Sequence, residues 1–201
     1  MKPFSLAVVL ASTALLAVGC SGKDNTVSNQ TSSSPSTESK PSISASVKPA
    51  PTQPSNGRKP VSFDPCVGLG DDVITKAGFD PGTRKRADQV HDNYAFIACT
   101  FERKQDVRGQ VLGVGDLTVS STNVSLDEFR KRQAGDSTEV NVNGRAAITY
   151  KRPESEACFV VMTGPDGTVD VQVSSTAALT DWNACDHAQE IAAIIETALP
   201  K

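Results

Sequence analysis

The chain has 201 residues, a formal net charge of −3 at pH 7 and a hydrophobic fraction of 38%. From residue 61 onward it carries 14 Lys and Arg residues against 21 Asp and Glu residues. This balance is opposite to the basic surface that neutralises phosphates. We therefore expect no nucleic-acid partner.

An apolar run near the N-terminus ends at Cys20. Lys2 precedes the apolar stretch 4–18, and Gly19 is the small residue that a signal peptidase requires before its cut. The run is too short for a comfortable membrane-spanning helix. We predict a lipoprotein signal peptide at residues 1–19, with Cys20 acylated by palmitate or similar chains. A secretory signal cut elsewhere and an uncleaved anchor are the alternatives.

Residues 20–60 are expected to form a lipidated, disordered tether. Between residues 21 and 60 the sequence has eleven Ser, four Thr and six Pro and no aromatic residue. Such a segment buries too little apolar surface to offset its chain entropy. The predicted location is the cell membrane, lipid-anchored on the outer face of the cytoplasmic membrane or in the cell envelope.

Residues 61–201 have the mixed composition and the length of a single globular domain. Asp64 and Pro65 predict the start of a helix that runs to about Ala77. The charged segment 81–92 is expected to be a loop, either solvated or binding. Alternation predicts strands at 94–102 and 114–122 with a loop at 103–113 between them.

The second half of the domain carries clear turn and cap signals. Ser125 and Glu128 form a capping box for a short helix to about Ala134, and Asn143-Gly144 predicts a two-residue hairpin turn. A further turn at 164–167 joins two more strands, and a final helix begins near Thr180 or Asp181. The fold class is therefore α+β, with an antiparallel sheet of five or six strands flanked by an N-terminal and a C-terminal helix.

Four cysteines remain once Cys20 is set aside, which fits two disulfides in an exported protein. Three connectivities are possible. We favour Cys66 with Cys99 and Cys158 with Cys185, because each bond then joins a terminal helix to the sheet. A four-cysteine metal site is the alternative, but no pair has the short spacing of structural zinc, and we predict no metal and no cofactor.

Several of these segments together resemble the LprB/LprC-like family of actinobacterial lipoproteins. The resemblance covers about residues 63 to 198 and the lipobox, the segment of the signal peptide that ends at Cys20. It depends on these positions: Phe63–Cys66, Ala77–Pro81, Cys99–Phe101, Val142–Gly144, Cys158 and Cys185. The family often has Trp where this chain has Phe101. The resemblance implies a surface-anchored α+β domain in the cell envelope, and it transfers no catalytic residue.

Residues suited to catalysis are scarce. The two histidines, His91 and His187, lie in no recognised motif, and the neighbouring Asp71 and Asp72 suit the positive end of a helix dipole. We therefore predict no enzyme and no catalytic residue, and expect a lipoprotein that binds a small amphipathic ligand or an envelope protein. An accessory envelope hydrolase and a purely structural protein are the alternatives. An apolar cavity between sheet and helices would favour a lipid-like ligand.

Overall fold

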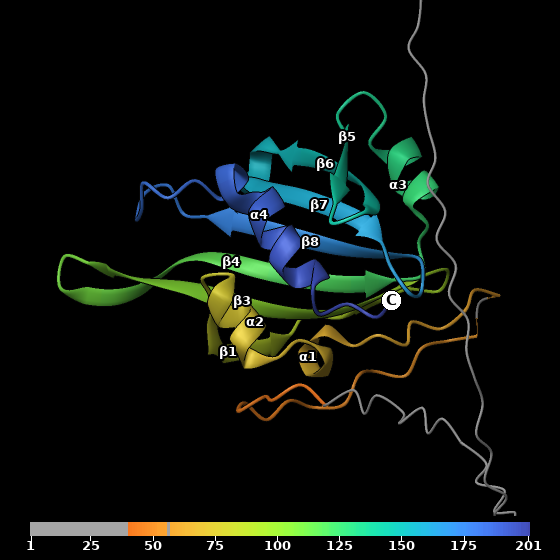
Figure 1. Cartoon of the computed structure of the whole chain (residues 1–201), viewed down its shortest axis with the longest axis horizontal. Coiled ribbons are helices and arrows are strands. Elements are labelled where there is room, and N and C mark those ends of the chain that lie inside the picture. Colours follow the sequence, from red (N-terminus) through yellow and green to blue (C-terminus); the bar gives the residue numbers. More distant parts are fainter. Residues whose placement is uncertain (1–39, 56) are drawn as a thin grey trace, which may run out of the picture. The chain divides into compact units, whose positions relative to one another are not determined.

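The computed structural model describes residues 40–55 and 57–201 (Figure 1). The predicted signal peptide and the lipidation site Cys20 lie outside the described residues. Within the described part, none of the helices has the length and apolar character needed to cross a membrane.

One antiparallel sheet of eight strands forms the centre of the domain. Seven strands follow the order β1-β3-β4-β8-β7-β6-β5, and the short β2 pairs with β3. The strands are β1 (Asp80–Arg86), β2 (Gln89–Val90), β3 (Ala95–Val107), β4 (Gln110–Thr122), β5 (Thr138–Val142), β6 (Arg145–Arg152), β7 (Ala157–Thr163) and β8 (Thr168–Ser175). This confirms the predicted α+β class and the antiparallel sheet, but the predicted number of five or six strands is too low.

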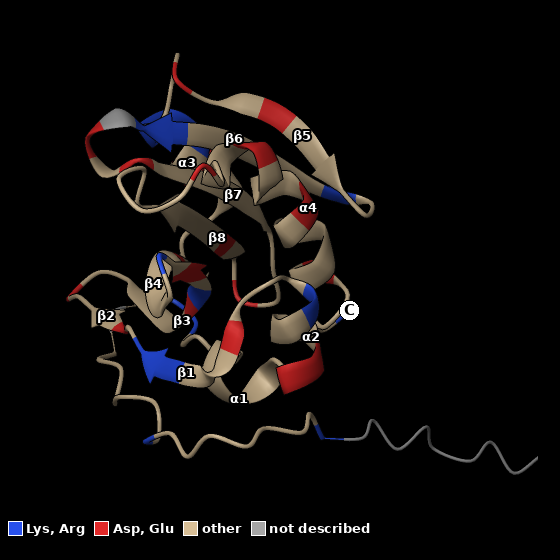
Figure 2. Ribbon diagram, turned by 90° about the vertical axis from the view of Figure 1, so that its left-hand side faces the viewer, with Lys and Arg blue, Asp and Glu red and all other residues tan. Residues whose placement is uncertain are grey.

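Four α-helices and a short 3₁₀ helix accompany the sheet. The α-helices are α1 (Pro65–Gly68), α2 (Asp71–Lys76), α3 (Leu126–Arg132) and α4 (Ala184–Glu196), and the 3₁₀ helix is η1 (Pro153–Ser155). Helix α4 packs on β7 and β8 and also contacts α2, and the two helices lie on the same side of the sheet in Figure 2. Helix α3 packs on β6 and β7.

The two faces of the sheet carry separate apolar clusters. Cys158 and Val160 of β7 belong to the larger cluster, which includes α1, α2 and α4. Phe159 and Val161 belong to a smaller cluster with α3. Since successive strand residues point to opposite faces, α4 and α3 cover opposite faces of β7. We call these the α4 face and the α3 face.

The two additional strands lie in segments for which we predicted loops. Segment 81–92 contains most of β1 and all of β2, and segment 103–113 is the outer part of the β3–β4 hairpin, turning at Arg108 and Gly109. Charged residues hid β1 from the pattern, and several of them find partners in the folded protein: Arg84 contacts Asp71, for example. The outer hairpin is solvent-exposed and therefore needs no apolar alternation.

The helix limits also differ from the prediction. Leu69 adopts an extended conformation after α1, so the predicted helix to Ala77 is two short helices. Gly68 packs against the ring of Phe63, where a side chain would collide. Helix α4 begins at Ala184 rather than near Thr180, because the Asn183 side chain caps it by accepting the N–H of Cys185.

Other local predictions are confirmed. Asp64 caps α1, Ser125 and Glu128 form the capping box of α3, and Asn143 and Gly144 both have positive φ in the β5–β6 turn. Such a turn matches the twist of the two strands that it joins.

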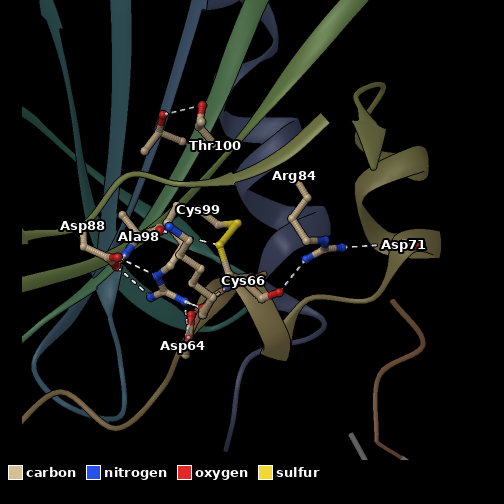
Figure 3. The surroundings of a disulfide bond; sticks show 11 residues. Asp64, Cys66, Asp71, Arg84, Asp88, Ala98, Cys99 and Thr100 are labelled. Carbon is tan, nitrogen blue, oxygen red and sulfur yellow. Dashed lines mark hydrogen bonds and ion pairs between the residues drawn. A yellow bond between two sulfur atoms is a disulfide. The ribbon is translucent and has the colours of Figure 1, made fainter. Parts of the chain in front are cut away.

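Both disulfides have the favoured pairing, Cys66–Cys99 and Cys158–Cys185. The first joins α1 to β3 and the second joins β7 to α4. Figure 3 shows the first bond beside the buried Arg84, whose guanidinium donates to the carbonyl of Cys66 at 3.1 Å and to the carboxylate of Asp71 at 2.7 Å. Each terminal helix is therefore cross-linked to the sheet.

The described part of the predicted tether contacts the domain. Ser44 donates from its backbone N–H and its hydroxyl to Asp71, at 2.8 and 2.7 Å. Further along, Arg58 pairs with Glu128, and the buried carboxylate of Asp166 accepts both backbone N–H groups of residues 62 and 63. These contacts connect the segment before α1 to α2, α3 and the β7–β8 turn.

Candidate ligand-binding groove

The α3 face of the sheet contains a groove, and its floor follows from strand register. Thr118, Gln172, Phe159 and Tyr150 are successive partners across β4, β8, β7 and β6. In the neighbouring row, Ser120 pairs with Asp170. The floor therefore changes from aromatic on β6 and β7 to polar on β8 and β4.

Aromatic rings line two parts of the groove. Tyr150 and Phe159 are stacked with ring centroids 4.7 Å apart. Across from them, Phe96 makes edge contacts with Tyr94 at 5.8 Å and with Phe129 of α3 at 6.4 Å. Phe129, Tyr150 and Phe159 are at most 5% exposed, so the ring surface open to a ligand comes mainly from the half-buried Tyr94 and Phe96.

Asp170 is the most unusual residue of the groove. Part of its surface remains exposed, but its Oδ1 is closed to solvent and has no hydrogen-bond partner among the described residues. Burial raises the pKa of Asp170 to about 7, and the charge of Arg152 opposes this rise only in part. The carboxyl group is therefore placed to hold a proton near neutral pH, and to accept or donate a hydrogen bond to a ligand.

The same surroundings shift the pKa of Tyr150. Burial and the nearby Asp170 raise the pKa of its hydroxyl, while Arg152 acts in the opposite direction. Its phenol thus stays neutral, and only 3% of the residue is exposed. Tyr150 and Arg152 of β6 and Asp170 of β8 form one electrostatically coupled group.

Two exposed arginines lie at the rim. Arg132, from the end of α3, lies over the ring of Tyr94 with its guanidinium carbon 5.3 Å from the centroid. Arg152, at the end of β6, lies over Phe159 at 4.9 Å. Both side chains line the groove, so cationic groups border its aromatic surfaces.

The groove has a volume of about 360 Å³, at the small end of the range for ligand sites. Its lining residues are Ala87, Gln89, His91, Tyr94, Phe96, Thr118, Ser120, Phe129, Arg132, Gln133, Tyr150, Arg152, Phe159, Asp170 and Gln172. A larger depression of about 660 Å³ shares Gln133, Tyr150 and Arg152 with it, and Tyr150 is the one aromatic residue in its lining. The smaller groove combines aromatic surface with converging polar groups, which is typical of ligand sites.

The two histidines lie in different parts of the structure. His91 is exposed at the groove and its ring lies 4.7 Å from that of Tyr94. His187 instead stacks on Trp182 at 5.4 Å and lies 3.7 Å from a carboxylate oxygen of Glu190. Only His91 therefore belongs to the candidate site.

The other residues considered from the sequence have structural roles. Asp71 binds Arg84 and Ser44, and both it and Asp72 lie in the first turn of α2. The four disulfide cysteines are all bonded. No cluster of His, Cys, Asp and Glu suited to a metal ion occurs in the described ranges 40–55 and 57–201.

Sequence reasoning missed the residues that define the groove. Asp170 stands between Val169 and Val171 in a strand that alternates regularly. Alternation places Asp170 on the face opposite the valines, but it does not reveal that α3 and the β2–β3 region enclose this face. A lone acidic residue in the middle of an apolar strand was the available signal.

The fold and the groove define a class: a disulfide-cross-linked α+β protein with one antiparallel sheet and an aromatic groove on one of its faces. Residues 15–197 match the family described as "Protein of unknown function (DUF3558)", and the chain belongs to this family. No curated protein and no solved structure matches the chain.

Proposed function

We propose that this protein is a lipid-anchored lipoprotein of the cell envelope that binds a small amphipathic ligand without chemically changing it. Within its family we place it with the LprB/LprC-like lipoproteins, nearer to LprC, on the basis of the segment Gly78–Arg86. Cys20 carries the lipid, and the domain presents the groove outside the cytoplasmic membrane. Its partners are then the membrane and the ligand.

The observation that carries the proposal is the groove itself. It offers aromatic rings to the apolar part of a ligand, and Asp170, Gln172 and the rim arginines to the polar part. The exposed part of Asp170 can exchange a hydrogen bond with the polar part of a ligand. An amphipathic molecule meets both surfaces at once.

The test is to purify the full chain from membranes in mild detergent and identify co-purifying small molecules by mass spectrometry. Tyr150→Ala with Phe159→Ala, which removes the stacked rings, should lose the bound molecule. Val111→Ala, at the exposed part of the outer hairpin, is the matched control and should retain it. Recovery of the same molecules with both variants would refute the proposal, and stoichiometric recovery of a protein instead would favour a partner protein.

An accessory envelope hydrolase is the second candidate, because His91, Ser120, Tyr150 and Asp170 line the same groove. Against it, the His91 side chain makes no hydrogen bond to a carboxylate or hydroxyl among the described residues, so no nucleophile–base pair is assembled. Turnover of a p-nitrophenyl ester by the native chain that is abolished by both His91→Ala and Ser120→Ala would support the hydrolase. Turnover that survives either change would exclude these residues as its catalytic machinery.

A further inference from the structure

We infer that the ligand of the groove is an anionic amphiphile with a carboxylate or phosphate head, held by Arg132 and Arg152. Its apolar part contacts the half-buried rings of Tyr94 and Phe96. This inference depends on the proposed function, since it names the charge of the molecule that the groove binds.

The first observation is the state of the two rim arginines. Five other arginines of the described chain meet a carboxylate at 3.0 Å or less: Arg58, Arg84, Arg86, Arg130 and Arg145. Arg132 and Arg152 have no such ion pair in the described ranges; the same holds for Arg103 and Arg108, which do not line the groove. Arg132 and Arg152 are exposed and contact aromatic rings instead. The groove is thus bordered by two guanidinium groups outside any ion pair, of which Arg152 also hydrogen-bonds Tyr150 and acts electrostatically on Asp170.

The second observation is that these guanidinium groups have defined positions. Each lies over a ring, Arg132 on Tyr94 and Arg152 on Phe159, and this contact limits the freedom of an otherwise flexible side chain. A guanidinium can donate two parallel hydrogen bonds to a carboxylate or phosphate. The head group can therefore bind at the rim while the apolar part remains on the aromatic surface.

The volume of the groove limits the size of the ligand. A cavity of about 360 Å³ lies near the lower limit for small-molecule sites. This suits a single acyl chain or ring system better than a two-chain lipid. Carboxylate and phosphate heads share the chemistry that the arginines recognise, so the experiment includes both.

The charge of Asp170 predicts how binding depends on pH. The charged or titratable groups that line the groove are Asp170 of β8, His91, Tyr94, Arg132 of α3, and Tyr150 with Arg152 of β6. An ionised Asp170 would repel an anionic ligand, and burial keeps this carboxyl protonated up to a pKa of about 7. Affinity for an anion should therefore fall as the pH rises through about 7, whereas affinity for a cation should rise.

The experiment measures binding by isothermal titration calorimetry to the full chain with Cys20→Ser, which removes the predicted acylation site. The probes are dodecanoate, dodecyl phosphate, dodecyl maltoside and dodecyltrimethylammonium, each below its micelle concentration. We expect both anions to bind more tightly than the neutral and cationic probes. Arg132→Ala and Arg152→Ala should each weaken anion binding about three- to tenfold, as expected for a charge-assisted hydrogen bond.

Neighbouring lysines supply the matched controls. Lys131 and Lys151 are exposed and adjacent in sequence to the two arginines but do not line the groove, so Lys131→Ala and Lys151→Ala should change affinity less than about twofold. Equal losses in the lysine and arginine variants would mean that general charge attracts the anion, and would overturn the inference. For dodecanoate, which stays ionised around pH 7, Asp170→Asn should abolish the pH dependence, and His91→Gln should preserve it.

The outcomes distinguish a failure of the anionic assignment from a failure of the proposed binding function. If the cationic or neutral probe binds as tightly as the anions, or if both arginine variants bind anions normally, the anionic assignment is wrong while a binding groove remains. If none of the four probes binds, the proposed binding function fails with it. Tighter binding of only dodecanoate or only dodecyl phosphate would support the inference and identify the head group.

Discussion

Replacing Asp170 with Asn should make the protein more stable at alkaline pH and leave its stability almost unchanged at acidic pH. The folded protein disfavours the ionised carboxylate because Oδ1 is closed to solvent and without a donor among the described residues. Asn keeps nearly the same shape and carries no charge. The substitution therefore removes the cost of ionisation and little else.

The magnitude follows from the difference in pKa between the folded and unfolded states. Burial raises the pKa from its ordinary value of 3.8 to about 7. Between these values the folded state binds more protons than the unfolded state, so the free energy of unfolding falls as the pH rises. At about 1.4 kcal/mol per pKa unit, the full loss is about 4 kcal/mol above pH 7. Because Asp170 keeps some exposed surface, we expect about 1 to 4 kcal/mol.

Urea unfolding at pH 4, 6, 7 and 8, with the disulfides intact, measures this effect. The native chain should lose stability across the range relative to Asp170→Asn, and the two curves should converge near pH 4. Asp92→Asn removes an exposed carboxylate and is the control, and it should follow the native curve. Parallel curves for the native chain and Asp170→Asn would show that the carboxyl ionises as easily in the folded state as in the unfolded state, and would refute the reasoning.

Three further predictions concern the framework around the groove. Cys158→Ser with Cys185→Ser opens a cross-link with a sequence separation of 27. This should lower the free energy of unfolding by about 3 to 4 kcal/mol in the chain-entropy model, measured by urea unfolding against the native chain with both disulfides intact. Asp166→Ala removes the buried acceptor for residues 62–63, which should lower the free energy of unfolding by about 1 to 3 kcal/mol. It should also speed tryptic cleavage after Arg58, and an unchanged cleavage rate would contradict this. The hydrogen bonds of that carboxylate outweigh burial and lower its pKa, so its stabilising contribution should be present above the ordinary value of 3.8 and disappear as the pH falls further. Arg84→Leu removes a fully buried guanidinium from its ion pair with Asp71 of α2. We expect the free energy of unfolding to fall by about 2 to 4 kcal/mol, measured by thermal or urea unfolding. An unchanged value would mean that the ion pair adds no net stability.

The elements that could be predicted are those whose signals are local. Ser125 and Glu128 cap α3, and Asn143-Gly144 turns the β5–β6 hairpin, because the backbone requirements of a cap or a tight turn are met by adjacent residues. The disulfide pairing was also accessible, since each bond joins elements that are near in sequence and adjacent in space.

The elements that could not be predicted depend on distant contacts. Strand β1 is an edge strand rich in charged residues: Arg84 pairs with Asp71 of α2, and Arg86 pairs with Asp64 and Asp88. Its sequence therefore looks like a loop. The groove likewise depends on α3 and the β2–β3 region approaching the same face of the sheet. Asp170 was visible as an acidic residue in an apolar strand, but its enclosure arises only from this tertiary arrangement.

The positions of the disulfides explain how the α3 face can contain an unpaired carboxyl group. Cys99 and Cys158 both belong to the apolar cluster of the α4 face, so both cross-links fix helices on that face. Each is worth about 3 to 4 kcal/mol in the chain-entropy model, the same order as the cost of ionising Asp170. Stability is therefore concentrated on one face of the sheet, and the opposite face can keep polar groups available for a ligand. If this reasoning is correct, Asp170→Asn should partly restore the stability lost in the Cys158→Ser, Cys185→Ser variant at pH 8, but not at pH 4.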